Sequence, residues 1–263
     1  MNREIFREYD IRGIVGETLD RDGAHTIGRG FGTFLNTHGG KTAVVGHDNR
    51  LSSQDLQQAV IDGLISTGCN VIDVGQLPTP AFYFGVIHLH ADGGIMVTAS
   101  HNPPEYNGFK MRRGEKAVFG DEIQEIWKII EGASFAAGEG SSEVRNIADD
   151  YLSAITQRIT LKRSLKVVAD AGNGTAGPLA TRLLKDLGCE LTELYCEPDG
   201  TFPNHLPDPT VEHNLVDLIA KVRETGADVG VAYDGDGDRL GAVDEKGNIV
   251  WGDQLLSLFT LDI

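Results

Sequence analysis

The sequence predicts an α/β protein made of two similar domains in tandem. Short apolar runs that are typical of buried strands alternate with segments of helical periodicity. The series strand, helix ending in Gly-Cys, strand, helix and strand occurs twice, with the copies about 120 to 135 residues apart. A chain of 263 residues is long enough for two ordinary domains.

The first copy is preceded by Tyr9-Asp10-Ile11-Arg12-Gly13, which we expect to form a loop. Its elements follow in order: a helix between Asp20 and Gly39, a strand at 41–46, a helix opened by the capping-box match Ser52-Ser53-Gln54-Asp55 and stopped by Gly68, a strand at 70–74, a helix from Pro78 to about His90, a strand at 93–97, a short strand at 109–111 and a helix at 123–130.

Small residues and glycines at 132–142 predict a linker or mobile loop near a domain boundary. The second copy then gives a helix with Ile147, Tyr151 and Ile155 on one face. Its remaining elements are a strand at 165–169, a helix that ends at Gly188, a strand at 190–194, a helix around 215–222 and a strand at 227–232.

Composition excludes several classes of function. The net charge of −16 argues against a nucleic-acid partner, which requires a basic face. No apolar run approaches the roughly 18 to 20 residues of a membrane helix, and the charged N-terminus does not resemble a secretory signal. Three cysteines without a CxxC pattern fit reduced thiols. We therefore expect a cytoplasmic protein with no membrane and no nucleic-acid partner.

The segment Thr98-Ala99-Ser100-His101-Asn102-Pro103-Pro104 is the first candidate site. It follows the strand at 93–97, and the two prolines forbid a helix there, so a stiff loop presents a hydroxyl beside an imidazole. Ligands bind beyond the carboxyl ends of strands in such sheets, which is where this loop lies. A hydrolase serine is a weaker alternative, because the GxSxG motif is absent.

The segment Asp234-Gly235-Asp236-Gly237-Asp238-Arg239 takes the equivalent place after the last strand of the second copy. Three carboxylates that alternate with glycines can turn inward in one tight loop, and hard oxygen ligands suit Mg²⁺ or Ca²⁺. An EF-hand competes for the same spacing. It requires glycine where Arg239 stands, and the flanking segments are strand-like, so we disfavour it.

The segment Gly172-Asn173-Gly174-Thr175-Ala176-Gly177 matches the dinucleotide pattern GxGxxG between a strand and a helix. Glycines also make strand-to-helix turns in α/β units that bind no nucleotide. We favour that structural explanation over a nicotinamide-dependent oxidoreductase.

Four motifs stand together in the order of one family. They are Tyr9-Asp10-Ile11-Arg12-Gly13, Thr98-Ala99-Ser100-His101-Asn102-Pro103, Asn107-Gly108-Phe109-Lys110 and Asp234-Gly235-Asp236-Gly237-Asp238-Arg239. The chain thereby resembles the α-D-phosphohexomutase superfamily, in its phosphomannomutase/phosphoglucomutase branch. The resemblance implies two tandem domains, each a mixed four-stranded sheet sandwiched between helices. Domain 1 would span residues 1–146, domain 2 residues 147–251, and a truncated third domain would start at 252–263.

The resemblance also implies the site residues and the reaction. Ser100 would be the phosphoserine that exchanges its phosphoryl group with a hexose phosphate through a bisphosphate intermediate. Glucose 1,6-bisphosphate or mannose 1,6-bisphosphate would be the activator. The metal, Mg²⁺, would be held by Asp234, Asp236, Asp238 and a phosphoserine oxygen of Ser100. The polar and cationic groups around the phosphoryl group would be Arg12, His101, Lys110 and Arg239, and Tyr9, Arg12 and Asn102 would line the substrate site.

His101 and Lys110 remain alternatives for the general base. The family's third and fourth domains, with their sugar and phosphate loops, are not in this sequence, so we expect weak or no mutase activity from this chain alone. The apolar segment at 252–263 predicts self-association. Phosphoglucosamine mutase and a non-catalytic metal- or phosphate-binding module remain alternative functions.

Overall fold

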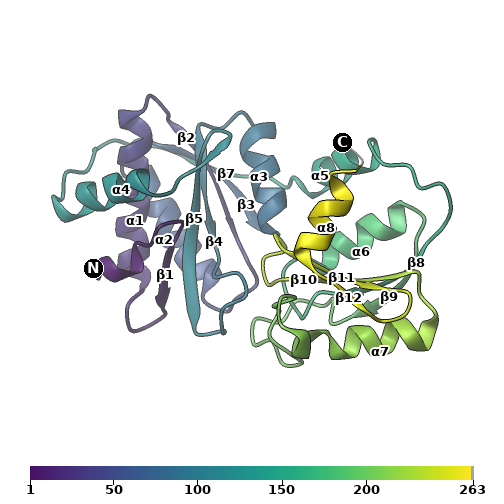
Figure 1. The fold of residues 1–263 in the computed structure, drawn as a ribbon. Helices are drawn as coiled ribbons and strands as arrows, with labels where there is room; N and C mark the ends of the chain where they lie inside the picture. Colours follow the sequence, from purple (N-terminus) through teal and green to yellow (C-terminus); the bar gives the residue numbers. More distant parts are fainter. Residues whose placement is uncertain (262–263) are drawn as a thin grey trace. The chain divides into compact units, whose positions relative to one another are not determined.

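The computed structural model describes residues 1–261 and divides into two compact units, Met1–Ile147 (unit 1) and Ala148–Ile263 (unit 2). Each unit contains one sheet with helices on both of its faces (Figure 1). The predicted α/β class with two similar sheets is therefore confirmed. No helix among the described residues is long and apolar enough to cross a membrane.

Unit 1 is built on a seven-stranded mixed sheet. Its strands are β1 (Ile11–Ile14), β2 (Thr42–His47), β3 (Asn70–Gln76), β4 (Gly93–Val97), β5 (Tyr106–Arg113), β6 (Lys116–Ala117) and β7 (Ser142–Val144). The order is β1-β5-β4-β2-β3-β7, with β6 paired to β5. The strands β4, β2, β3 and β7 run parallel, and β5 is antiparallel to both β4 and β1.

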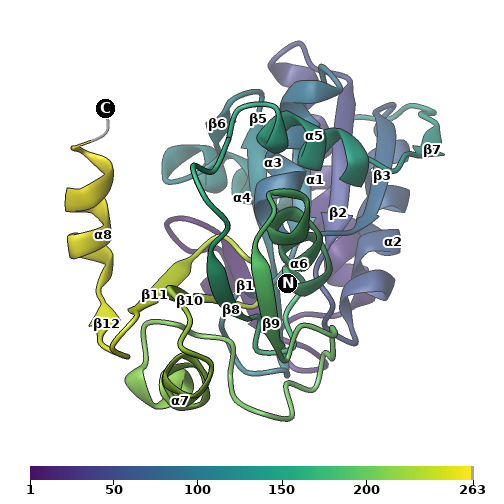
Figure 2. The ribbon, with the colours of Figure 1, turned by 90° about the vertical axis from the view of Figure 1, so that its right-hand side faces the viewer.

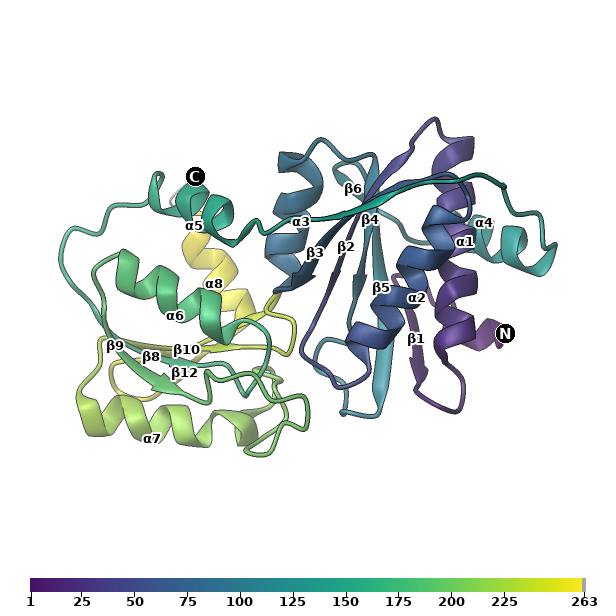
Figure 3. The same ribbon diagram turned by 180° about the vertical axis from the view of Figure 1, so that it is seen from behind.

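The helices of unit 1 are η1 (Arg3–Ile5), α1 (Arg21–Thr37), α2 (Ser53–Ile65), α3 (Thr79–His88) and α4 (Asp121–Glu131). One face of the sheet is covered by α1, α2 and α4, and the other by α3 (Figures 1 and 3). Side chains alternate accordingly, because successive residues of a strand point to opposite faces. Ala43 and Val45 join the core under α1, whereas Gly94 lies against Phe82 of α3.

Unit 2 has a five-stranded sheet. Its strands are β8 (Lys166–Asp170), β9 (Glu190–Leu194), β10 (Val229–Tyr233), β11 (Leu240–Asp244) and β12 (Ile249–Val250), and its helices are α5 (Ala148–Thr156), α6 (Gly177–Asp186), η2 (Glu212–Leu215), α7 (Val216–Thr225) and α8 (Gly252–Phe259). The order is β12-β11-β10-β8-β9. Leu218 and Val222 of α7 pack on Val168 at one face, and Leu184 of α6 packs near Ala169 at the other.

The repeat in the sequence appears as a shared strand order. The series β5-β4-β2-β3 in unit 1 corresponds to β11-β10-β8-β9 in unit 2, and in both the first strand is antiparallel to its neighbour. These are the four strands that the resemblance implies. Further strands extend each sheet. Residues 9–13 were expected to form a loop, but part of this segment belongs to β1, in which Arg12 pairs in register with Gly108. The two strands approach so closely there that a Cβ at Gly108 would meet the Ile11 oxygen at 2.2 Å.

The glycine-rich segment 132–142 is not the free linker that its composition predicts. Gly138 donates its N–H to the Ser66 oxygen at 3.1 Å, and β7 then adds a strand to β3. A Cβ at Gly140 would lie 1.9 Å from the Cys69 oxygen. These glycines therefore serve close approach of two main chains, and the boundary between the units follows at Ile147.

The capping box expected at the start of α2 is not formed. Ser52 precedes α2, but its side chain makes no capping hydrogen bond; its hydroxyl instead accepts from Asn107 at 2.8 Å. The apolar segment predicted at 252–263 forms α8 (Figure 2). No residue of α8 is buried, and Leu256 is 64% exposed. Residues 262 and 263 of that segment lie outside the described residues. The three cysteines are free.

Candidate active site

Ser100 lies just beyond the carboxyl end of β4, where the sequence places it. Its side chain is buried, with only 2% of the residue exposed, and its Oγ lies 3.1 Å from Nδ1 of His101. The backbone of Ser100 is left-handed, with φ at +54°. Few residues other than glycine adopt this conformation, because their Cβ crowds the main chain at a cost of about 1 to 2 kcal/mol. The N–H of Ser100 donates to Oγ1 of Thr98 at 2.9 Å.

The loop of Ser100 is held from below by Arg50, a residue that sequence reasoning missed. Arg50 follows β2, and its side chain is fully buried. The guanidinium donates to the carbonyl oxygens of Ser100, Asn102 and Pro103 at 2.7 Å each, and to that of Tyr106 at 3.1 Å. The sequence feature that could have identified Arg50 is the position of Asp48-Asn49-Arg50 just after the strand at 41–46. The carboxyl end of a strand is the edge at which ligands bind in such sheets.

A second layer of polar residues fixes Arg50 in turn. Asp48 accepts from Nε of Arg50 at 3.1 Å and from its main-chain N–H at 3.0 Å. The hydroxyl of Ser53 donates to the same carboxylate, and Nδ2 of Asn107 donates to that hydroxyl at 2.9 Å. All four residues are buried, so the buried charges of Asp48 and Arg50 are compensated within one connected network.

The cationic and polar candidates of unit 1 lie in this loop and on the strands β1 and β5. Arg12 of β1 donates from NH1 to Oδ1 of Asn102 at 2.6 Å and from NH2 to Asp10 at 2.5 Å. Lys110 lies on β5, in register with Met96 of β4, and is half-buried. The structure thus joins Arg12 to Asn102 and Ser100 to His101. Tyr9 is 76% exposed, and its ring lies 6.5 Å from that of Phe119.

The acidic loop of unit 2 brings its three carboxylates together. One ligand oxygen each from Asp234, Asp236 and Asp238 lies within 4.8 Å of the others. Asp234 and Asp236 are fully buried and Asp238 is exposed. Three hard oxygen donors converging from a short loop match the donor set that Mg²⁺ takes, and a divalent cation would offset their mutual repulsion. The neighbouring Arg239 is exposed, and its N–H donates to Oδ1 of Asp234 at 2.9 Å.

The glycine pattern at 172–177 supports this loop through its main chain. The N–H of Thr175 donates to the Gly235 oxygen at 2.9 Å, and a Cβ at Gly174 would lie 2.9 Å from the same oxygen. The N–H of Gly235 in turn donates to the Pro207 oxygen at 3.1 Å. Close packing accounts for the glycine pattern without a nucleotide.

Sequence comparison decides the family. A family model described as phosphoglucomutase/phosphomannomutase, alpha/beta/alpha domain I, matches residues 3–137, and the model of domain II matches residues 149–247. The chain belongs to the phosphoglucomutase/phosphomannomutase family. It is 46% identical over 259 residues to a phosphomannomutase/phosphoglucomutase of Pseudomonas aeruginosa and 45% identical over 263 residues to a phosphoglucomutase of Neisseria meningitidis.

The structure agrees with that assignment. A crystal structure of a phosphoglucomutase/phosphomannomutase family protein from Burkholderia thailandensis superposes with a TM-score of 0.97 at 50% identity, covering 100% of this chain and 59% of that one. The two curated relatives are matched over 98% and 99% of this chain, but over 56% and 57% of their own length. The chain thus spans a little over half the length of these members of the phosphoglucomutase/phosphomannomutase family.

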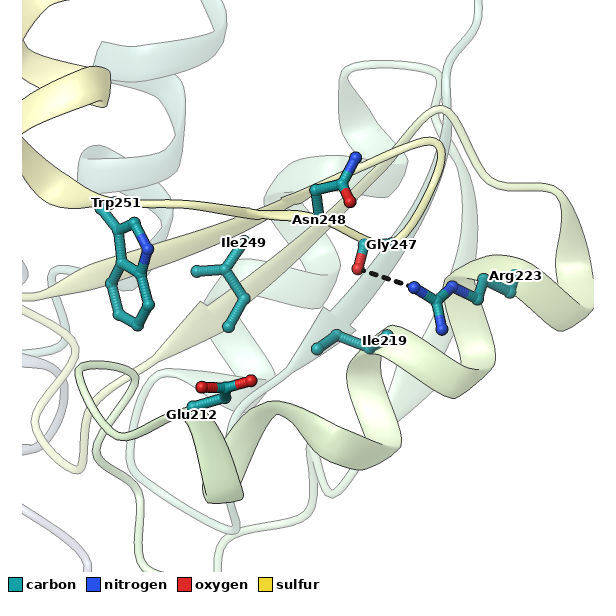
Figure 4. A pocket seen from close by; sticks show the side chains of 7 residues that line it. All are labelled: Glu212, Ile219, Arg223, Gly247, Asn248, Ile249 and Trp251. Atoms are coloured by element: carbon teal, nitrogen blue, oxygen red, sulfur yellow. Dashed lines mark hydrogen bonds between the residues drawn. The ribbon is translucent and has the colours of Figure 1, made fainter.

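Unit 2 has a surface pocket of about 440 Å³ (Figure 4). Its lining residues belong to none of the four motifs that the sequence shares with the phosphoglucomutase/phosphomannomutase family. Trp251 and Ile249 face Ile219 of α7 across it, and Glu212 closes one end. Arg223 donates to the Gly247 oxygen at 3.2 Å, which ties α7 to the turn before β12. No residue of the Ser100 loop or the acidic loop lines this pocket.

Proposed function

We propose that this chain carries out intramolecular phosphoryl transfer on hexose phosphates, converting mannose or glucose 1-phosphate to the 6-phosphate through a phosphoserine at Ser100. The observation that carries the proposal is the buried Ser100 hydroxyl beside Nδ1 of His101 in a strained, rigidly held loop. A nucleophile that is fixed in place suits a reaction whose catalysis is mostly positioning and charge stabilisation.

The reaction has two balanced halves. In the first, the Oγ–P bond of phosphoserine breaks as a hydroxyl oxygen of the sugar phosphate bonds to phosphorus, and the hydroxyl proton passes to a base. This gives a hexose 1,6-bisphosphate. After the sugar reorients, its other O–P bond breaks, the phosphoryl group returns to Oγ of Ser100, and the released sugar oxygen takes the proton. His101 and Lys110 are the two candidate bases.

The reaction also requires that negative charge on the phosphoryl oxygens be stabilised in the transition state. Arg12, Lys110 and Arg239 are the cations assigned to the phosphoryl oxygens, and Tyr9 and Asn102 are assigned to the substrate. Mg²⁺ held by Asp234, Asp236 and Asp238, with a phosphoserine oxygen as a further ligand, would supply Lewis-acid stabilisation of the phosphoryl oxygens. Hexose phosphate is the proposed partner, and a hexose 1,6-bisphosphate the activator that loads Ser100.

The test is intact mass with site mapping, before and after incubation with glucose 1,6-bisphosphate and Mg²⁺. We expect one phosphoryl group on Ser100, absent in Ser100→Ala and absent when a chelator replaces Mg²⁺. Mass gain at another residue with Ser100 unmodified would contradict the assignment.

A further inference from the structure

The side chain of Arg50 uses every N–H that a guanidinium has. Nε donates to Asp48, one terminal nitrogen donates to Pro103 and Tyr106, and the other donates to Ser100 and Asn102. Four of these five contacts reach main-chain oxygens between Ser100 and Tyr106, the first residue of β5. A planar fork of five donors can satisfy them together, whereas a lysine ammonium offers three donors from one point.

We propose that Arg50 is a positioning residue, which holds Ser100 in its left-handed backbone conformation and thereby aims Oγ for phosphoryl transfer. The inference rests on the function proposed above. Both peptide groups of Ser100 are fixed: its N–H by Oγ1 of Thr98 at 2.9 Å and its carbonyl oxygen by Arg50 at 2.7 Å. Fixing the groups on either side of the Cα sets the backbone angles and with them the direction of the Cα–Cβ bond.

The strain at Ser100 indicates why such a device is needed. A serine relaxes readily from a φ of +54° into the ordinary α or β regions when nothing prevents it. Strain of this kind persists only where surrounding contacts impose it. Arg50 supplies those contacts at the carbonyl side and holds the rest of the loop through Asn102 and Pro103.

The guanidinium of Arg50 is itself held by the scaffold of unit 1. Asp48 is buried at the end of β2 and binds both Nε and the main-chain N–H of Arg50. Its other donor is the hydroxyl of Ser53 in the first turn of α2. The position of the guanidinium is therefore set by a strand and a helix of the scaffold, and the loop takes its position from the guanidinium.

A melting-temperature cycle tests the backbone claim without any reaction. With Arg50 present, Ser100→Gly should melt about 2 °C above Ser100→Ala in the transition of unit 1, because glycine carries no Cβ penalty at positive φ. In the Arg50→Lys background the loop relaxes, and the gap should vanish or reverse. An equal gap in both backgrounds would overturn the proposal. So would an Arg50→Lys protein without a cooperative transition, since Arg50 would then serve folding as a whole.

Phosphoryl loading tests the catalytic claim. The maximal rate at which glucose 1,6-bisphosphate and Mg²⁺ phosphorylate Ser100 should fall about 100-fold in Arg50→Lys, because an error of about 1 Å in position is that costly. The half-saturating bisphosphate concentration should stay within threefold, since Arg50 touches no substrate. Arg21→Lys, at an exposed arginine paired with Asp55, is the matched control and should load at the original rate.

The outcomes separate this inference from the function on which it rests. If the unsubstituted protein loads Ser100 and Arg50→Lys loads it equally fast, the positioning role is wrong and the function stands. If the unsubstituted protein does not load, the function and the catalytic part of the inference fail together. The melting cycle then decides whether Arg50 holds the loop.

Discussion

The Ser100 loop and the acidic loop hold equivalent places in two similar sheets, yet they are supported in different ways. Each connects a parallel strand to the antiparallel strand beside it, β4 to β5 in unit 1 and β10 to β11 in unit 2. Each is also braced by the loop that follows the neighbouring parallel strand. In unit 1 the brace is the side chain of Arg50, and in unit 2 it is the main chain of Gly174 and Thr175.

The difference follows from what each loop presents. The Ser100 loop offers carbonyl oxygens to the buried guanidinium of Arg50, which leaves the Ser100 hydroxyl beside His101. A guanidinium beside the acidic loop would pair with Asp234 and Asp236 and neutralise the charges that a cation needs. Bracing through glycines avoids any competing charge. In the same architecture, the loop of the candidate nucleophile is therefore held by a cationic side chain, and the loop of the candidate metal site by uncharged main-chain groups.

The largest expected effect comes from removing one buried carboxylate of the acidic loop. Asp236→Asn should weaken Mg²⁺ binding by about 100-fold or more in calorimetric titration, because the ion loses a charged ligand. Without metal the same variant should melt higher, since the buried carboxylates repel one another less. Asp253→Asn, at an exposed carboxylate of unit 2, is the control for a charge change alone. Unchanged Mg²⁺ affinity in Asp236→Asn would remove this residue from the metal site.

A smaller effect should follow from disturbing the brace of the acidic loop. In Gly174→Ala the added Cβ meets the Gly235 and Ala171 oxygens at 2.9 and 3.0 Å, so the acidic loop must shift. We expect unit 2 to lose about 1 to 3 kcal/mol in urea unfolding, with Mg²⁺ affinity lowered about tenfold. Gly252→Ala is the matched control, because a Cβ there meets nothing within 4 Å. If both variants behave alike, the brace does not set the loop.

The two loops also show how far sequence reasoning reaches. Ser100 and the three aspartates can be recognised in the sequence because the functional side chains are adjacent or alternate along the chain. Arg50 cannot, because its partners are carbonyl oxygens 50 to 56 residues away, and every residue has a carbonyl oxygen whatever its type. The positions of the central strands and of the helices along the chain followed from periodicity, since the central strands are buried and the helices amphipathic.

The segments that sequence reasoning missed are edge elements and glycines. The strands β1 and β7 lie at the edges of the sheet of unit 1 and are short, with four and three residues, and all residues of β7 are exposed, so neither shows a clear apolar pattern. In the sequence, a glycine that permits close approach of two main chains cannot be distinguished from one that permits flexibility. Gly140 therefore suggested a linker, although it packs on Cys69. Only the fold distinguishes the two uses.

A histidine stands beside the segment that braces the acidic loop. His205 lies two residues before Pro207, whose oxygen accepts from Gly235. Its Nε2 lies 3.2 Å from both oxygens of the buried Asp170, and its Nδ1 lies 2.9 Å from the Leu206 oxygen. Both ring nitrogens face acceptors, so the doubly protonated imidazolium fits this setting.

Burial alone lowers the pKa of His205, but hydrogen bonds to Asp170 and the Leu206 oxygen, with the charges of Asp170 and Asp217, outweigh it and raise the pKa above its usual 6.5. A raised folded-state pKa gives stability that is fully present below the unfolded-state pKa and is lost as pH rises through the folded-state pKa.

The melting temperature of unit 2 should therefore fall as pH rises above about 6.5. His205→Gln should flatten this slope, and His213→Gln, at an exposed histidine, should keep it. An identical pH slope in His205→Gln would show that this histidine does not couple the brace of the acidic loop to pH.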